Sequence, residues 1–279
     1  QTASGVTQSF TRDLLGRLTK KDTAIYTWDT LKQGLLTSET DQGITRTYAY
    51  NNALQLSQLS VTVDGVTRTI KHQYDSILGR PKALEYPNGL TLKYSYNAQG
   101  YLSKTSNANS NYVYREVTAI DAQGHITGAT LANNLMSQSS SFNLNSGTMS
   151  TTSVSQGITQ IHGHTYSEYD EYLNITAEVN NLTGLNKTYS YDTLNRLTTY
   201  TASNTSPAFS LSVNYAHDAV GNLLKKTDYS ANKNTAYQYC EGSNALCILE
   251  KSSGQIVNFT YDGRGNLING DGLTLTYNA

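Results

Sequence analysis

The sequence predicts an all-β protein, a long antiparallel meander of hairpins that curls into a shell-like or barrel-like wall. A strand–turn–strand unit recurs at intervals of about two dozen residues, which is the signature of a repeat architecture. Apolar and polar residues alternate between the turns, and no stretch shows a sustained helical period. We therefore expect residues 1–279 to form a single array of strands with almost no helix.

The clearest copy of the unit begins at Phe259 and ends at Leu267. Phe259 and Tyr261 are two residues apart, so their side chains project from the same face of an extended strand. Asp262 opens a turn because its carboxylate can accept backbone N–H groups that follow it. Gly265 can adopt positive φ without steric cost, and Leu267 begins the return strand.

Each copy is placed by the residue equivalent to Asp262, and most of these residues are Asp or Asn. The series is Asp13, Asp29, Asn51, Asp75, Asn97, Asp121, Asn145, Asp170, Asp192, Asp218, Cys240, Asp262 and Asn278. Asn145 and Cys240 are placed mainly from the spacing. In the best copies the left-handed position of the turn is filled by Gly16, Gly79, Gly221, Gly265 and, since Asn also tolerates this conformation, Asn195.

A second set of turn signals lies about halfway between these positions. Examples are Asp41-Gln-Gly43, Asp64-Gly65, Pro87-Asn88-Gly89, Asn133-Asn134, Gln156-Gly157, Ser252-Ser-Gly254 and Asn269-Gly-Asp-Gly272. Asp-Gly and Asn-Gly favour two-residue hairpins because both central residues of such turns take positive φ. Two turns in each period predict two strands in each period.

The composition supports a sheet with at least one face in water. The chain has 22 Tyr against 4 Phe, only 3 Pro, and 15% charged residues. Tyrosine suits a half-buried strand because its ring packs while its hydroxyl reaches water or a partner. Aromatic residues recur two apart before the turns, as in Tyr26/Trp28 and Tyr189/Tyr191, which predicts a ladder of aromatic contacts across the strands.

The charge pattern excludes some classes of function. The net charge is −1 and there is no basic run, so we expect no nucleic-acid partner. The pairs Lys20-Lys21 and Lys225-Lys226 are interpreted as solvated strand ends. No apolar run is long enough for a transmembrane helix, and the first residues lack the profile of a signal peptide.

The pattern Tyr-Asp-x-x-Gly-(Arg/Asn)-Leu resembles the YD repeat of the Rhs family. Copies that begin at Tyr74, Tyr169, Tyr191 and Tyr261 carry the resemblance, which extends over essentially the whole chain. It implies a β-sheet that spirals into a hollow cocoon around a toxin, as in bacterial Rhs proteins and the B and C subunits of Tc toxins; teneurins share the repeat. The implied partners are a toxin cargo polypeptide and adjoining YD-repeat segments, and the implied location is extracellular, within a larger secreted bacterial protein.

The resemblance does not assign a catalytic residue here. Full-length Rhs proteins carry an aspartate-dependent self-cleavage segment beyond the repeats. No Asp of this chain lies in a motif that resembles that segment. The array stops within a repeat at Asn278, so we expect a segment of a larger protein. Edge strands near Gln1 and Ala279 would then be unpaired, which predicts self-association of the isolated segment.

The candidate chemical sites have simpler structural interpretations. His162 and His164 could share one strand face, but no third metal ligand is evident, so we expect no metal site and no cofactor. Most Asp residues occur at the recurrent turn, where turn formation accounts for them better than catalysis does. We expect a protein that is not an enzyme.

Cys240 and Cys247 flank a six-residue insertion at a repeat turn. Residues at the base of a hairpin can approach disulfide distance, so one alternative is a disulfide in an exported chain. The other is a reduced pair in a protein that folds around its cargo in the cytoplasm. The spacing leaves both open.

Two functions follow from the sequence. The first is structural: the chain forms part of the wall of a shell that encloses and carries a toxin polypeptide. The alternative is a cell-surface module that recognises glycans or proteins through a Tyr-rich sheet face. Clustered exposed Tyr side chains would favour recognition.

Overall fold

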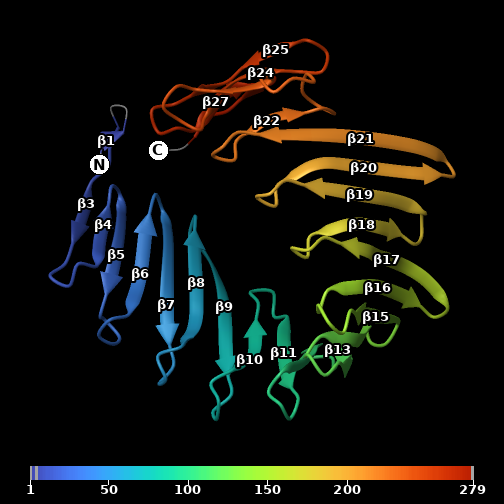
Figure 1. Ribbon diagram of the computed structural model, residues 1–279. Helices are drawn as coiled ribbons and strands as arrows, with labels where there is room; N and C mark the ends of the chain where they lie inside the picture. Colours follow the sequence, from blue (N-terminus) through green and yellow to red (C-terminus); the bar gives the residue numbers. More distant parts are fainter. Residues whose placement is uncertain (1, 4–5, 278–279) are drawn as a thin grey trace. The chain divides into compact units, whose positions relative to one another are not determined.

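The computed structural model describes residues 2–3 and 6–277. These residues fold into two compact units, one built mainly from residues 7–138 and the other mainly from residues 139–277. Every regular element in the described residues is a β-strand (Figure 1). No helix in this part of the chain is long and apolar enough to cross a membrane. The expectation of an all-β antiparallel meander is confirmed.

The first unit is a meander of successive antiparallel strands from β3 to β14. Two short strands, β1 (Thr2–Ala3) and β2 (Val6–Thr7), come before this meander in the chain. The strands of the meander are β3 (Phe10–Arg12), β4 (Leu18–Lys21), β5 (Ala24–Trp28), β6 (Leu36–Asp41), β7 (Ile44–Tyr50), β8 (Leu56–Val63), β9 (Val66–Tyr74), β10 (Pro81–Glu85), β11 (Thr91–Tyr96), β12 (Leu102–Asn107), β13 (Val113–Ile120) and β14 (Ile126–Leu131). The division between the units falls within β15 (Met136–Phe142).

The second unit contains a meander of its own from β16 to β22, followed by two three-stranded sheets, β23-β24-β25 and β26-β27-β28. Its strands are β16 (Met149–Gln156), β17 (Thr159–Tyr169), β18 (Ile175–Asn180), β19 (Leu185–Tyr191), β20 (Leu197–Thr205), β21 (Ala208–His217), β22 (Leu223–Lys226), β23 (Tyr237–Tyr239), β24 (Leu246–Glu250), β25 (Ile256–Asn258), β26 (Thr260–Tyr261), β27 (Leu267–Gly270) and β28 (Leu273–Thr274).

The two faces of each meander differ in chemistry. On one face, aromatic and aliphatic side chains pair across strands; in β19 and β20, the Tyr189 and Tyr200 ring centroids are 5.5 Å apart. On the other face, Ser and Thr hydroxyls bond across the strands, as in Thr188–Thr201 at 2.6 Å. Ser60 and Thr69 repeat this arrangement at 2.8 Å in the first unit. Each sheet therefore has an aromatic face and a hydroxyl face, which follow from the period-two alternation of the sequence.

Few residues are fully buried, because a single sheet has only its own neighbours to pack against. The largest buried cluster lies in the second unit and consists of Ala236, Tyr237, Leu249 and Val257. Most other strand residues are half-buried. The meanders are therefore stabilised along the sheet, by backbone pairing and cross-strand side-chain contacts, more than by a central core.

Candidate functional site

The recurrent turn has the same hydrogen-bond geometry in copy after copy, and Asp192 shows it clearly. Its Oδ1 accepts the backbone N–H groups of Leu194 at 2.9 Å and Arg196 at 3.0 Å. Its Oδ2 accepts the Arg196 Nε–H at 2.7 Å. The Asp192 backbone N–H donates to the Arg196 carbonyl, and Asn195 takes the left-handed conformation with φ of 58°. The carboxylate therefore closes the turn from inside.

Asp13, Asp218 and Asp262 are bonded in the same way, each accepting the backbone N–H groups two and four residues later. The left-handed position has positive φ in each copy: Gly16 (79°), Gly221 (95°), Gly265 (85°) and, after one extra residue in the turn opened by Asp75, Gly79 (67°). Asn51 and Asn97 keep the acceptor without the charge. The sequence pattern thus corresponds to a physical turn.

These bonds lower the pKa of the turn carboxylates. The Asn266 side chain, followed by its backbone N–H, lowers the pKa of Asp262. The backbone N–H of Leu78, followed by the Arg80 side chain, lowers the pKa of Asp75 to about 2. Hydrogen bonds to the ionised form favour that form. The carboxylates are therefore committed to the turn and poorly suited to take up a proton near neutral pH.

The structure corrects one position of the repeat. The turn predicted to open at Asn145 opens at Asn143, whose Oδ1 accepts the backbone N–H groups of Asn145 and Ser146 at 2.9 and 3.1 Å. Gly147 takes the left-handed position with φ of 72°, because this turn is one residue longer, like the turn at Asp75. Asn278, Gln1 and Ala279 lie outside the described residues.

A tyrosine precedes many of these turns and has a role that the sequence pattern did not reveal. Its hydroxyl donates to the backbone carbonyl of the first residue of an earlier strand. The bonds are Tyr50 to Leu36, Tyr74 to Leu56, Tyr96 to Pro81, Tyr169 to Met149, Tyr191 to Ile175, Tyr239 to Leu223 and Tyr261 to Leu246, at 2.6–2.9 Å. Trp28 uses its Nε1–H in the same way toward Leu18. A phenylalanine could not make this bond, which gives a physical reason for Tyr at these positions.

A β-bulge accompanies these tyrosines. The register shifts between Ser190 and Tyr191 and at the equivalent place in other copies, such as between Ala49 and Tyr50. A bulge re-aims a side chain without ending the pairing. The bulge and the hydroxyl bond together fix each aromatic residue beside its turn.

Neighbouring turns are also joined directly. In the second unit, Asn174 Nδ2 donates to Asn195 Oδ1 at 2.9 Å, and the Arg196 guanidinium donates to the Asp218 carbonyl at 2.7 Å. In the first unit, Gln55 Nε2 donates to the Gly79 carbonyl at 2.7 Å. The residue that follows the left-handed position thus reaches the next turn, so the turns form a bonded row along one edge of each sheet.

Cys240 occupies the position of the turn-opening Asp and is joined to Cys247 by a disulfide, with a Cα–Cα distance of 5.1 Å. The Cys240 backbone N–H still donates to the Ala245 carbonyl, as in the other turns. The disulfide therefore stands where other copies use a side-chain acceptor to close the turn.

A buried carboxylate occurs on the aromatic face of the second unit. Glu178 Oε1 accepts Lys187 Nζ at 2.6 Å and the Tyr189 hydroxyl at 2.9 Å. Burial alone would raise the pKa of Glu178, but the bonds from Lys187 and Tyr189 outweigh it and leave the pKa below its usual value. In the first unit, Arg46 and Tyr48 bond Glu39 in the same register. Both clusters pair opposite charges within the sheet.

His162 and His164 lie on the same strand with ring centroids 5.0 Å apart. His164 Nδ1 is 3.7 Å from Glu178 Oε2. Among the described residues, no group of three or more His, Cys, Asp or Glu side chains is arranged to hold a metal ion.

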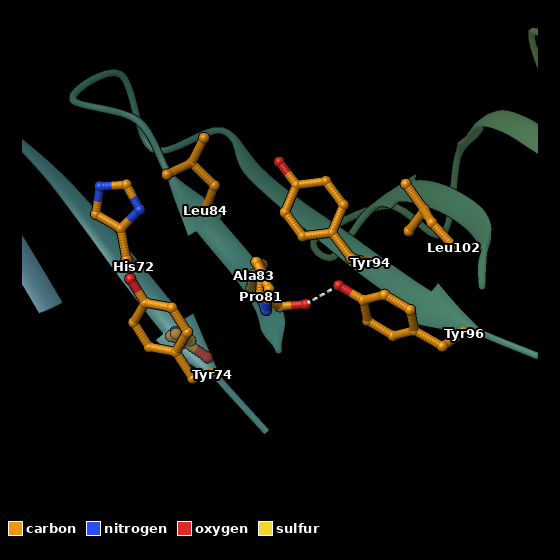
Figure 2. Close-up of a pocket in the computed structure, with 9 residues that line it drawn as sticks. His72, Tyr74, Pro81, Ala83, Leu84, Tyr94, Tyr96 and Leu102 are labelled. Carbon is orange, nitrogen blue, oxygen red and sulfur yellow. Dashed lines mark hydrogen bonds between the residues drawn. The ribbon is translucent and has the colours of Figure 1, made fainter. Parts of the chain in front are cut away.

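A pocket of about 300 Å³ lies on the aromatic face of the first unit, over β9 to β12 (Figure 2). Its wall includes His72, Tyr74, Leu84, Tyr94 and Tyr96. The Tyr74 and Tyr96 hydroxyls are already bonded to backbone carbonyls, so these residues present mainly ring surface. The pocket suits apolar or aromatic groups.

No model of a known protein family matches the sequence, and no curated protein matches it. Solved structures do match. The crystal structure of TcdB2-TccC3 aligns with 98% of this chain and 18% of its own chain, at 14% identity and a TM-score of 0.69. A Tc holotoxin pore from Photorhabdus luminescens aligns with 97% of this chain and 17% of its own, at 14% identity and a TM-score of 0.68.

A complex titled TcdB2-TccC3-Cdc42 also aligns, with 94% of this chain and 15% of its own, at 14% identity and a TM-score of 0.57. The chain thus spans less than a fifth of the length of each of these proteins. At this identity the likeness concerns the fold alone. The chain shares its fold with a segment of Tc toxin proteins.

Proposed function

We propose that this chain is a structural module, part of the wall of a shell that encloses and carries a toxin polypeptide within a larger secreted bacterial protein. The observation that carries the proposal is the likeness of nearly the whole chain to a segment of TcdB2-TccC3. The partners in this proposal are the enclosed polypeptide and adjoining repeat segments.

The internal construction supports a role as a wall. Most turns at one edge of each meander are closed by their own carboxylate or amide, and neighbouring turns there are bonded through side chains such as Arg196. Tyrosine hydroxyls such as that of Tyr191 tie adjacent strands together again near the same edge. A sheet built in this way can extend by repetition, since each repeat is stabilised mainly by its neighbours.

The two faces suit containment without strong specific binding. One face presents Ser and Thr hydroxyls that bond to each other, and the other presents half-buried aromatic rings. The pocket over β9 to β12 offers ring surface to an apolar side chain of a passing polypeptide. In the proposal this module is not an enzyme, because its recurrent carboxylates already accept backbone N–H groups.

Recognition of glycans or proteins through Tyr side chains has less support. Most tyrosines before the turns use their hydroxyls within the sheet, so those groups are not free to bind a sugar. The more exposed tyrosines include Tyr101 and Tyr172, which lie at turns.

A protease-protection experiment tests the proposal in the full-length protein that contains this segment. We expect a polypeptide that co-purifies with the shell to resist proteinase K until the shell is unfolded. The control is the Gly221→Val variant of the same protein, in which a strained turn should weaken the wall and increase digestion. Equal digestion of every part of the unmodified protein would refute encapsulation, and selective retention on a glycan array without protection would favour recognition.

A further inference from the structure

The pocket over β9 to β12 lies where one copy of the repeat departs from two others. Those two copies carry an ion pair across adjacent strands of the aromatic face: Glu39–Arg46 and Glu178–Lys187. In each pair the basic residue precedes the tyrosine before the turn by four residues, and Leu92 stands in the same place before Tyr96. Leu92 pairs with Leu84. Two aliphatic side chains therefore replace the ion pair in this copy.

A tyrosine of this copy lacks the acceptor that its counterparts have. Tyr48 donates its hydroxyl to Glu39 at 3.2 Å, and Tyr189 donates its hydroxyl to Glu178 at 2.9 Å. Tyr94 occupies the same position in β11, where an aliphatic residue replaces the carboxylate. Within the part of the chain that the structure describes, the Tyr94 hydroxyl has no hydrogen-bond partner. Burial raises the pKa of Tyr94, so the hydroxyl stays protonated and can donate at neutral pH.

The other walls of the pocket add ring surface and a second hydrogen-bonding group. His72 pairs with Leu84 across β9 and β10, and Figure 2 shows His72 and Tyr94 on opposite sides of Leu84. The His72 imidazole has no hydrogen-bond partner among residues 2–3 and 6–277. The hydroxyls of Tyr74 and Tyr96 are bonded to backbone carbonyls. The pocket thus combines aromatic rings with hydrogen-bonding groups that the fold itself leaves unused.

The lining indicates what the pocket can hold. None of the described side chains that line it is Asp, Glu, Lys or Arg, so a charged group would lose water there without gaining an opposite charge. Arg80, which stacks on the Tyr96 ring, is already paired with Asp75. Aromatic rings contact other rings favourably, edge to face or offset. A phenol hydroxyl both donates and accepts, so it can bond the Tyr94 hydroxyl and the His72 imidazole.

We propose that this pocket binds a tyrosine side chain of a polypeptide, with the ring against Leu84 and the tyrosine rings and the hydroxyl bonded to Tyr94 and His72. The volume of about 300 Å³ is at the lower end for ligand pockets, which suits one side chain. The source of the polypeptide rests on the proposed function, in which the shell encloses it. The binding can be measured without any shell, so the two proposals can fail separately.

An NMR titration of the chain with N-acetyl-tyrosinamide tests the proposal. We expect saturable shifts of the Leu84 and Tyr94 signals, with a dissociation constant on the order of 1 mM for so small a ligand. N-acetyl-phenylalaninamide should bind at least about threefold more weakly because it lacks the hydroxyl. N-acetyl-leucinamide should bind more weakly still. Tyr94→Phe combined with His72→Leu should remove the preference for the phenol.

A second variant rebuilds the ion pair of the other copies. Leu84→Glu with Leu92→Lys should reproduce the Glu178–Lys187 arrangement, fill the pocket and weaken N-acetyl-tyrosinamide binding at least about tenfold. The matched control is Lys93→Gln, because this exposed residue alternates with Leu92 and Tyr94 and lies on the opposite face. The control should bind like the parent. Urea midpoints establish that each variant is folded.

Three results would each overturn the proposal: no saturable binding to the parent, equal affinity for the tyrosine and leucine amides, or full binding by the folded variant with the rebuilt ion pair. Binding in a full-length protein that fails to protect any polypeptide from protease would leave the pocket and refute the shell. Protection without binding would refute the pocket and leave the shell.

Discussion

The turns at the two edges of each meander are closed by different means. At one edge, a side chain such as that of Asp192 or Asp262 accepts two backbone N–H groups inside the turn. At the other edge, hairpins such as Asp64-Gly65 rely on two residues with positive φ, 51° and 77°. Tyrosine hydroxyl bonds accumulate at the first edge, whereas side chains join neighbouring turns at both edges; at the second edge, Asn204 Nδ2 donates to the Thr183 carbonyl at 2.7 Å. Backbone conformation alone can reverse a strand, but joining one hairpin to the next requires side chains.

The disulfide provides the sharpest test of how side chains close the turns of the first edge. Cys240 opens its turn without a side-chain acceptor, and the disulfide takes the place of that acceptor. Replacing both Cys240 and Cys247 with Ser should lower the free energy of unfolding by about 2 kcal/mol, as expected for a short closed loop. Cys240→Asp combined with Cys247→Ser should recover part of this loss by supplying the missing acceptor. Urea unfolding of the three proteins measures the effect. No recovery with Asp would show that this turn differs from the others.

The left-handed position is the feature that the two edges share. Gly265→Val and Gly65→Val should each cost about 1–2 kcal/mol, because a β-branched residue is strained at positive φ. A Cβ at either site meets no atom within 4 Å, so the cost comes from the backbone and not from a clash. Gly265→Ala serves as a smaller perturbation. Urea midpoints that differ widely between the two Val variants would mean that the edges impose different backbone constraints.

Among the described residues, a carboxylate closes its own turn at one edge only. Asp262→Ala should cost about 1 kcal/mol, in the range of other lost caps and hydrogen bonds. Asp262→Asn should cost less because Asn51 and Asn97 keep the acceptor in their own turns. Gln156→Ala, at an opposite turn, should change stability by less than about 0.5 kcal/mol. If Ala and Asn at position 262 prove equally neutral, the Asp has some role other than turn formation.

The tyrosine bond should be measurable by removing a single oxygen. Tyr191→Phe should cost about 0.5–1 kcal/mol because the Ile175 carbonyl loses a donor at 2.8 Å. Tyr101→Phe is the matched control, since that ring is exposed at a turn. Chemical unfolding distinguishes the two variants. If both variants are equally stable, the tyrosine hydroxyl bond does not stabilise the first edge.

The smallest predicted effect is on the stability of the fold at acidic pH. The folded-state pKa of Asp75 is about 2, below the ordinary value near 3.9, so its contribution is fully present above about pH 4. That contribution is lost as the pH falls toward 2, because protonation of the carboxylate ends its role as an acceptor. Asp75→Asn should therefore flatten the fall in the urea midpoint between pH 5 and 2. If the urea midpoint of the Asp75→Asn variant falls as steeply with pH as that of the parent, Asp75 does not contribute to the loss of stability in acid.

The positions of the turns were largely available from the sequence, because Asp or Asn followed by a left-handed Gly or Asn is a local requirement. Asp13, Asp192, Asp218 and Asp262 all open turns where the pattern placed them. Asn145 was misplaced because two Asn residues, 143 and 145, compete for the same position and the spacing favoured the second. Only the longer turn, which ends at Gly147, distinguishes them.

The sequence by itself determined the all-β class, the two faces and the turn chemistry, since each depends on residues close together in the chain. The tertiary structure decided what joins one repeat to the next. The Tyr191 hydroxyl meets the Ile175 carbonyl, and Arg196 meets the Asp218 carbonyl, only after strands have paired in one register with a bulge before the tyrosine. Register is a property of paired strands, and a local pattern does not specify which distant carbonyl will face a side chain.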